Sequence, residues 1–322
     1  MRTVSERLCC MKGKALDKRA TENRHERGMV LMLGSALVLP AMDAVAKLLS
    51  AQMAVGQISF MRFLLQALML CPAALMLRSG WRQVLRLSFR AILKLVAAGV
   101  LVAAAIVCLY FAQANMPLAN AIAIFFVEPL LLTLISALVL KEHVGLRRYV
   151  AVAIGLGGAM IVIRPNWAMF GPVAVLPALA ALFYAGHLAT IRSITAELSG
   201  LMVQALSSVA AFTLLGLLLW GGDLSGNALF NWSEPDARAW WLFAAMGVMS
   251  TVSHLMLTVA FKYTPASILA PFQYLEIFSA TILGYLLFGD FPDMLTWVGT
   301  GVIFGSGGYV FYAERRLVRR LK

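Results

Sequence analysis

The chain has 322 residues, of which 61% are hydrophobic and only 13% are charged. Soluble domains carry about a quarter charged residues, so this chain has too few of them to cover an aqueous surface. The net charge of +12 would suggest nucleic-acid binding in a soluble protein, but in a membrane protein it usually reflects basic cytoplasmic loops.

Residues 1–27 are polar, mixed in charge and without the apolar core of a signal peptide, so we interpret them as a disordered cytoplasmic N-terminal tail. Two cysteines lie in this tail, Cys9 and Cys10, and two lie in apolar stretches, Cys71 and Cys108. Their spacing fits neither a metal site nor a disulfide framework. We therefore expect reduced cysteines, no metal and no cofactor.

Ten later stretches are apolar enough, some only just, for membrane-spanning helices of about 20 residues. Short linkers make neighbouring helices antiparallel, and continuous rather than alternating apolar runs exclude a transmembrane β-barrel. The sequence therefore predicts an all-α polytopic membrane protein with ten transmembrane helices. The ten stretches cover residues 29–50, 56–78, 91–113, 117–140, 146–163, 171–190, 199–220, 238–260, 266–289 and 293–312.

The Lys and Arg residues gather on one side of this arrangement. With the N-terminus in the cytoplasm, 23 of the 27 lie in the termini and the inside loops, whereas Arg164 and Arg238 lie outside. Because basic residues favour the cytoplasmic side, both termini are predicted to be cytoplasmic, including the basic C-terminal tail 314–322. Topology thus explains the positive charge, and no nucleic-acid partner is expected.

The sequence contains a weak internal repeat. A shift of 148 residues pairs Glu128 with Glu276, and it pairs Glu142 with Asp290. Each half, at 28–164 and 171–313, then holds five spans, and because five is odd the second half is inverted. Glu142 has basic neighbours along the sequence and Asp290 has none, which agrees with the inversion. Two inverted five-helix repeats are typical of secondary transporters, whose substrate sites lie near the bilayer midplane.

The segments that close the two halves carry a resemblance. They read "MPLANAIAIFFVEPLLLTLISALVLKEHVGLRRYVAVAIGLGGAMIVIRP" and "YTPASILAPFQYLEIFSATILGYLLFGDFPDMLTWVGTGVIFGSGG", and they resemble EamA-type members of the drug/metabolite transporter (DMT) superfamily. The stretches "MRFLLQALML" and "DAVAKLL" are similar to the branch that holds bacterial S-adenosylmethionine and riboflavin carriers and animal solute carrier 35 G proteins.

This resemblance implies a multi-pass secondary transporter of the bacterial inner membrane with a central cavity. The substrate it implies is a small organic metabolite, such as riboflavin or an S-adenosylmethionine-like cofactor, moved with a proton or against a counter-substrate. Export of amino acids or toxic metabolites is the alternative. The resemblance also implies a possible homodimer, because in the family the glycine-rich helices that close each half can contribute to a dimer.

Two acids mark the centre of the predicted membrane region. Glu128 and Glu276 each lie 11 residues after a proline that opens their span, which places both near the midplane. Charges there are costly and usually functional, so we expect the pair to build one site for a proton, a cation or a substrate group. A hydrogen bond that only locks the fold is the alternative. Pro129 removes a backbone donor and should kink the helix, leaving the Phe125 carbonyl bare.

A second cluster is predicted toward the outer side. Asp43 and Lys47 are four residues apart on one helix face, and Arg62 enters from the outside with Gln66 one turn later. We expect Arg62 or Lys47 to neutralise Asp43, and Arg62 suits a substrate carboxylate or phosphate. Snorkelling of Lys47 to the interface is the alternative. Weaker candidates for substrate contact are Gln113, Asn120, Tyr184, His187, His254, Gln273 and Tyr274, of which the last two lie within one turn of Glu276.

Small residues are concentrated in "GLGGAM" from Gly155 and "GSGG" from Gly305, which predicts close helix packing. A membrane enzyme is the rival class, but the sequence shows no His/Asp cluster, no Gly-x-Ser-x-Gly and no Walker-type loop. A channel would show a repeated filter or polar pore rings, which are also missing. The sequence therefore predicts a carrier rather than an enzyme.

Overall fold

The structure is a computed structural model of the chain and describes residues 4–76, 87–139, 146–194, 198–264, 269, 272–273 and 275–320. Side chains are described from residue 26 to residue 309 of these ranges, apart from 136–139, 146–148, 165 and 261–262. The helices are α1 (Val4–Leu49), α2 (Val55–Met76), α4 (Phe89–Asn115), α5 (Leu118–Phe125), α6 (Glu128–Val139), α7 (Leu146–Phe170), η1 (Gly171–Val175), α8 (Leu176–Arg192), α9 (Gly200–Ser225), η2 (Ala228–Phe230), α10 (Ala237–Tyr263), α12 (Leu275–Phe288) and α13 (Met294–Arg320).

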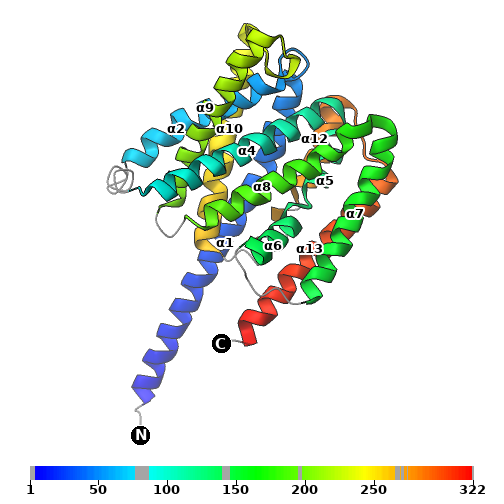
Figure 1. Cartoon of the computed structure of the whole chain (residues 1–322). Helices are drawn as coiled ribbons and strands as arrows, with labels where there is room; N and C mark the ends of the chain where they lie inside the picture. Colours follow the sequence, from blue (N-terminus) through cyan, green and yellow to red (C-terminus); the bar gives the residue numbers. More distant parts are fainter. Residues whose placement is uncertain are drawn as a thin grey trace.

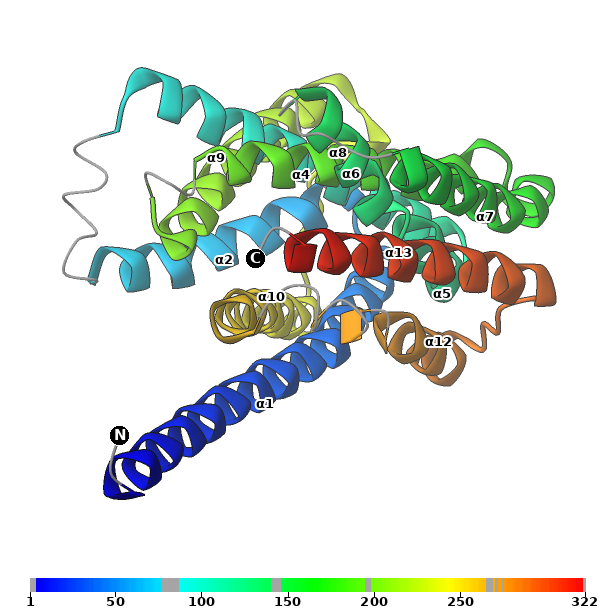
Figure 2. The ribbon, with the colours of Figure 1, turned by 90° about the horizontal axis from the view of Figure 1, so that it is seen from below.

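Helices that are distant in the sequence pack side by side. The helix α1 lies against α10 and α12, α4 lies against α8, and α7 lies against α13 (Figures 1 and 2). Both termini project from the same side of the bundle (Figure 1). We call this the terminal side, and the opposite side, where α1 ends and α2 begins, the distal side. The first and second halves of the chain are therefore packed against each other along their length.

The prediction of an all-α polytopic fold is confirmed over the described residues. All ten predicted stretches are helical over most of their described length. Seven helices of the described part are long and apolar enough to cross a membrane, and two more, Tyr149–Arg164 and Leu275–Phe288, are apolar but shorter. The chain is therefore a multi-pass membrane protein by the length and composition of its helices.

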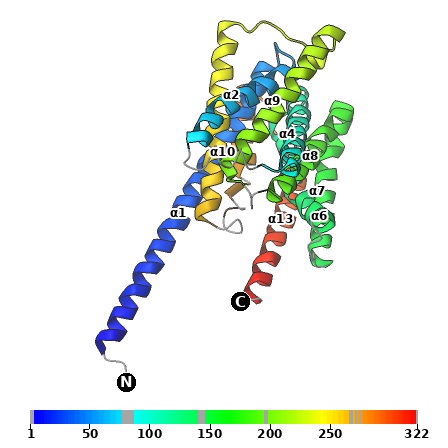
Figure 3. The same cartoon turned by 60° about the vertical axis from the view of Figure 1, so that its left-hand side comes forward.

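The N-terminal tail differs from its predicted disorder. The helix α1 begins at Val4 and continues without interruption into the first apolar stretch, so its early turns project beyond the other helices (Figure 3). Residues 4–27 contain no proline and are rich in Ala, Leu, Met, Lys, Arg and Glu, which favour helix. Polar composition argued against packing, but it did not argue against helix. The C-terminal tail is likewise helical up to Arg320 as the end of α13.

The fourth predicted span consists of two helices. The chain leaves α5 at Phe125, turns through Phe126 and Val127, and enters α6 at Glu128. The interruption thus lies just before Pro129, because a proline is tolerated in the first turn of a helix but not in its interior. The predicted kink is present as a two-residue break, and it places Glu128 at the start of a new helix.

Glycines of α7 hold it close to α13. A side chain at Gly158 would collide with Val302 and with the backbone of Gly299, and a side chain at Gly299 would collide with Val162. The predicted close packing is therefore confirmed for α7. On α13 both Gly299 and the "GSGG" run take part in the contact, because Ser306 lies against Gly155 of α7, although a side chain added at Gly305 or Gly308 would meet no described atom within 4 Å.

Replacing Gly299 by Ala is expected to destabilise the protein by about 1–3 kcal/mol, because the added methyl group overpacks the contact with α7. Gly301→Ala is the matched control, because a side chain there meets nothing within 4 Å and Ala favours helix. Thermal denaturation of the detergent-solubilised variants, followed by size-exclusion chromatography, measures the difference. Equal melting temperatures for the two variants would contradict the tight α7–α13 contact.

Candidate functional site

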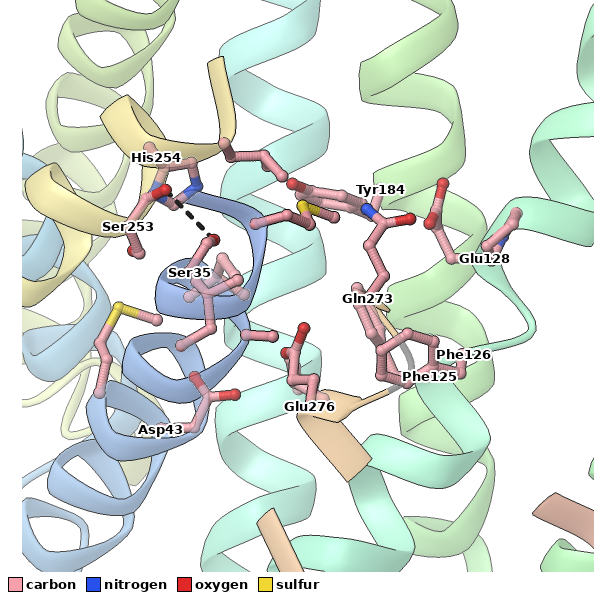
Figure 4. A pocket seen from close by; sticks show the side chains of 18 of the residues that line it. Ser35, Asp43, Phe125, Phe126, Glu128, Tyr184, Ser253, His254, Gln273 and Glu276 are labelled. Atoms are coloured by element: carbon pink, nitrogen blue, oxygen red, sulfur yellow. Dashed lines mark hydrogen bonds between the residues drawn. The ribbon is translucent and has the colours of Figure 1, made fainter. Parts of the chain in front are cut away.

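A cavity lies inside the bundle and is lined by both halves of the chain (Figure 4). The space inside it that water molecules can occupy is about 100 Å³. The polar lining residues, named from α1 through to α12, are Ser35, Asp43, Arg62, Glu128, Tyr184, Ser253, His254, Gln273 and Glu276.

One of the three lining carboxyl groups begins a helix. Glu128 lies in the first turn of α6, directly after the break at Phe126 and Val127, whereas Glu276 lies on α12. The unpaired amides at a helix start favour a negative charge, so the position of Glu128 can hold a carboxylate within an apolar bundle. Figure 4 shows the two acids on different walls, with Gln273 drawn between them. Oε1 of Glu128 is buried and has no hydrogen-bond partner among the described residues.

Asp43, the third acid, lies on α1 and is 5% exposed. Its Oδ2 accepts a hydrogen bond of 3.2 Å from Nε2 of Gln113, which reaches across from α4. Gln113 is therefore not a lining residue itself but orients one that is. Because one amide donor does not neutralise a carboxylate, the remaining oxygen of Asp43 stays available to the cavity.

Arg62 supplies the positive charge of the described lining. It is 4% exposed, and its guanidinium lies 5.5 Å from the ring centroids of both Phe63 and Tyr110. Nη1 donates a hydrogen bond of 2.9 Å to the Tyr110 hydroxyl, while Nε is buried without a described partner. The rings and the hydroxyl fix the guanidinium plane. Its remaining donors can therefore meet a planar anion in a set orientation.

The predicted outer cluster is only partly correct. Asp43 and Arg62 both line the cavity, but no ion pair joins them among the described side chains. Lys47 does not line the cavity, because its side chain turns away to pair with Asp290, 2.8 Å distant. Nothing in the sequence indicates that Lys47 is the partner of Asp290, because the two residues are 243 positions apart and Asp290 has no basic neighbour along the chain.

Aromatic and imidazole groups complete the walls. The ring centroids of Phe125 and Tyr184 are 5.6 Å apart and the ring planes are inclined by 59°, so each ring offers a separate apolar face to a flat ligand. Nδ1 of His254 is 2.7 Å from the Ser250 carbonyl oxygen, which only accepts, so Nδ1 carries the proton. In the neutral ring Nε2 is then an acceptor.

Three other predicted candidates support the fold instead of lining the cavity. Gln66 accepts a 3.2 Å hydrogen bond from Ser250, and Asn120 donates a 2.8 Å hydrogen bond to Asn166. His187 is buried with Nδ1 2.8 Å from the Ala98 carbonyl oxygen. These polar groups therefore tie helices together. Tyr274, the last candidate, lies outside the described residues.

The sequence alone did not single out Ser35 and Ser253. The Ser35 hydroxyl donates a 3.3 Å hydrogen bond to the Ser253 carbonyl oxygen and links α1 to α10 across the cavity wall (Figure 4). Serines are common in apolar helices, so their type gave no signal. Phe125 and Phe126 were likewise hidden in an apolar run, although their place just before the Glu128–Pro129 pair marked them as residues of the break.

Comparison with known proteins agrees with this architecture. The chain is 29% identical over 273 residues to the pseudopaline exporter CntI of Pseudomonas aeruginosa, covering 84% of this chain and 91% of the relative. It is 29% identical over 207 residues to the riboflavin transporter of Vibrio cholerae, covering 63% and 66%. It is 22% identical over 296 residues to the S-adenosylmethionine uptake transporter of Rickettsia prowazekii, covering 90% and 94%.

One crystal structure of a protein shares the fold with a TM-score of 0.61 at 18% identity, covering 89% of this chain and 97% of the other. Two stretches of the chain, residues 26–164 and 171–311, each match the model of the EamA-like transporter family. Because these two matches span nearly all of the sequence, the chain belongs to the EamA-like transporter family.

Proposed function

We propose that the protein is a secondary transporter that moves a small organic metabolite by alternating access around the cavity. The observation that carries this proposal is the cavity lining, which both EamA-like halves supply and which holds three carboxyl groups and one guanidinium. Charged groups inside apolar helices are costly, and they usually serve a polar solute or ion that enters the bundle.

The topology we propose has ten spans in two inverted five-helix repeats, with both termini in the cytoplasm of a bacterial inner membrane. Support comes from the seven helices long enough to span, from the two shorter apolar helices and from the shared side of the termini. The repeats are residues 28–164 and 171–313, flanked by the tails 1–27 and 314–322. The bias of Lys and Arg toward the terminal side supports the orientation.

The substrate we propose carries a positive group and a carboxylate on a partly flat body. Glu128 and Glu276 attract the positive group, and Arg62 holds the carboxylate. Phe125 and Tyr184 each offer the flat body an apolar face. S-adenosylmethionine has these features, whereas riboflavin has only the flat ring system. A proton or a counter-substrate drives the cycle, and the relatives' names include both uptake and export, so both directions belong in the test.

Membrane vesicles of both orientations, loaded or surrounded with labelled S-adenosylmethionine, riboflavin and amino acids, test the proposal. We expect saturable transport of the zwitterionic solutes that responds to a pH gradient or to counter-substrate on the opposite side. Vesicles with an empty vector are the control. Absence of gradient dependence and of counterflow for every solute would contradict the carrier function itself.

A further inference from the structure

An ion pair outside the cavity joins the two halves of the chain on the distal side. Nζ of Lys47 lies 2.8 Å from Oδ2 of Asp290 and 3.0 Å from the Met116 carbonyl oxygen. The ammonium also lies 4.6 Å from the centroid of the Phe288 ring. Among the described side chains this is the single ion pair. Lys47 and Met116 belong to the first EamA-like match, and Asp290 and Phe288 belong to the second.

The chain builds the position of Asp290 with a glycine turn. The helix α12 ends at Phe288, and Gly289 adopts a φ of +73°, a conformation that other residues rarely adopt. The amide of Asp290 then donates a 3.1 Å hydrogen bond to the Gly284 carbonyl oxygen. This turn folds Asp290 back toward the bundle, so its carboxylate meets Lys47 instead of pointing into solvent.

The pair lies next to the distal end of the cavity. Asp43 lines the cavity, and Lys47 follows it by one helical turn of α1, a rise of about 6 Å. The side chains of Lys47 and Asp290 are 13% and 29% exposed, so water reaches both. Water can therefore replace each partner when the pair separates, unlike a fully buried pair, which would leave an unpaired charge.

We propose that Lys47 and Asp290 form the distal gate of the cavity. In the conformation seen here the pair holds the two halves together on the distal side, and it separates when the cavity opens to that side. The inference rests on the proposed function, because alternating access requires contacts between the halves that form on one side and break on the other. Asp290 is thus a positioning residue that acts on access to the cavity and does not touch the solute.

Labelling of a cysteine in the cavity wall tests the gate. Leu39→Cys, at a lining position on α1, is introduced after the four native cysteines are replaced by Ala, and a membrane-impermeant thiol reagent is applied from either side. We expect Asp290→Asn to raise the labelling rate from the distal side roughly two- to fivefold, the shift expected from losing one partly hydrated ion pair. Labelling from the terminal side is expected to fall.

The paired exchange Lys47→Asp with Asp290→Lys is expected to restore slow distal labelling, because it rebuilds the attraction with reversed charges. Asp293→Asn is the matched control, since this nearby acid caps α13 by accepting a 3.0 Å hydrogen bond from the Thr296 amide. Lys47→Gln gives a second single variant with intact Asp290, so the test does not depend on the folding of one protein.

A distal labelling rate that stays unchanged in both single variants would overturn the gate, even if either variant were less heat-stable. The pair would then only stabilise the fold and would not control access to the cavity. Labelling requires no solute. The labelling experiment therefore tests the gate even if the protein transports none of the solutes in the vesicle panel. Conversely, a negative labelling result would not change a transport activity measured in the vesicles.

Discussion

Glu128→Gln is expected to reduce transport roughly 10- to 100-fold at equal membrane abundance, the loss that corresponds to one hydrogen-bonded charge. Gln keeps the size of the side chain and its place at the start of α6, so the break after Phe125 is retained. What it removes is the negative charge that we propose for the solute's positive group or for a proton. Initial rates of uptake and efflux, measured between about pH 5 and about pH 8, check the result.

Glu128→Asp and Glu234→Gln are the controls for this prediction. Aspartate preserves the charge and should retain part of the activity, and Glu234 is an exposed acid outside the described cavity lining whose loss should have no effect. Glu128→Gln with normal transport across the whole pH range would contradict a transport role for Glu128.

The second acid makes the test sharper. If Glu128 and Glu276 act on one solute or proton, the double Gln variant should lose little more than the more impaired single variant, because coupled groups are not additive. Two independent sites would instead give losses that multiply. The two acids differ in one respect, since Pro129 stands next to Glu128 whereas Ile277 follows Glu276, so the single variants need not be equally impaired.

The helices of this protein were readable from the sequence, but their partners were not. Apolar runs with short linkers predicted the ten apolar helical stretches, although not the helical turns of residues 4–27, because membrane spans need length and low charge whatever they pack against. The glutamate–proline pair likewise predicted an interruption near Phe125, since local chemistry decides it. The break came slightly later along the chain than the bare carbonyl at Phe125 suggested, because the proline is accommodated in the first turn of α6.

The acids that line the cavity could be predicted from the sequence, but the hydrogen-bond partners around the cavity could not. An unpaired acid in an apolar run signals a polar environment, so Asp43, Glu128 and Glu276 were found from sequence and all three line the cavity. Hydrogen-bond partners across the bundle carry no such signal. The sequence therefore predicts a substrate contact for Asn120, which bonds Asn166 instead. It also predicts that Arg62 or Lys47 neutralises Asp43, whereas Lys47 pairs with Asp290.

Replacing Arg62 by Lys is expected to weaken the apparent affinity for carboxylate-bearing solutes roughly tenfold or more, with a smaller change in maximal rate. Lysine keeps the positive charge but lacks the planar fork that can hold both oxygens of a carboxylate. The guanidinium is 4% exposed and fixed by Tyr110 through a 2.9 Å hydrogen bond, so its orientation belongs to the protein before a solute arrives. Concentration series of uptake rates with a carboxylate-bearing solute and its amide analogue measure the effect.

Tyr110→Phe separates recognition from support. It removes the hydroxyl that accepts from Arg62 but leaves the guanidinium in the cavity, so it should reduce affinity far less than Arg62→Lys if Arg62 binds the solute. Equal losses in the two variants, or a loss that is the same for the carboxylate and the amide, would mean that Arg62 only braces Tyr110. The discrimination between the two solutes is the decisive readout, because damage to packing alone lowers transport of both alike.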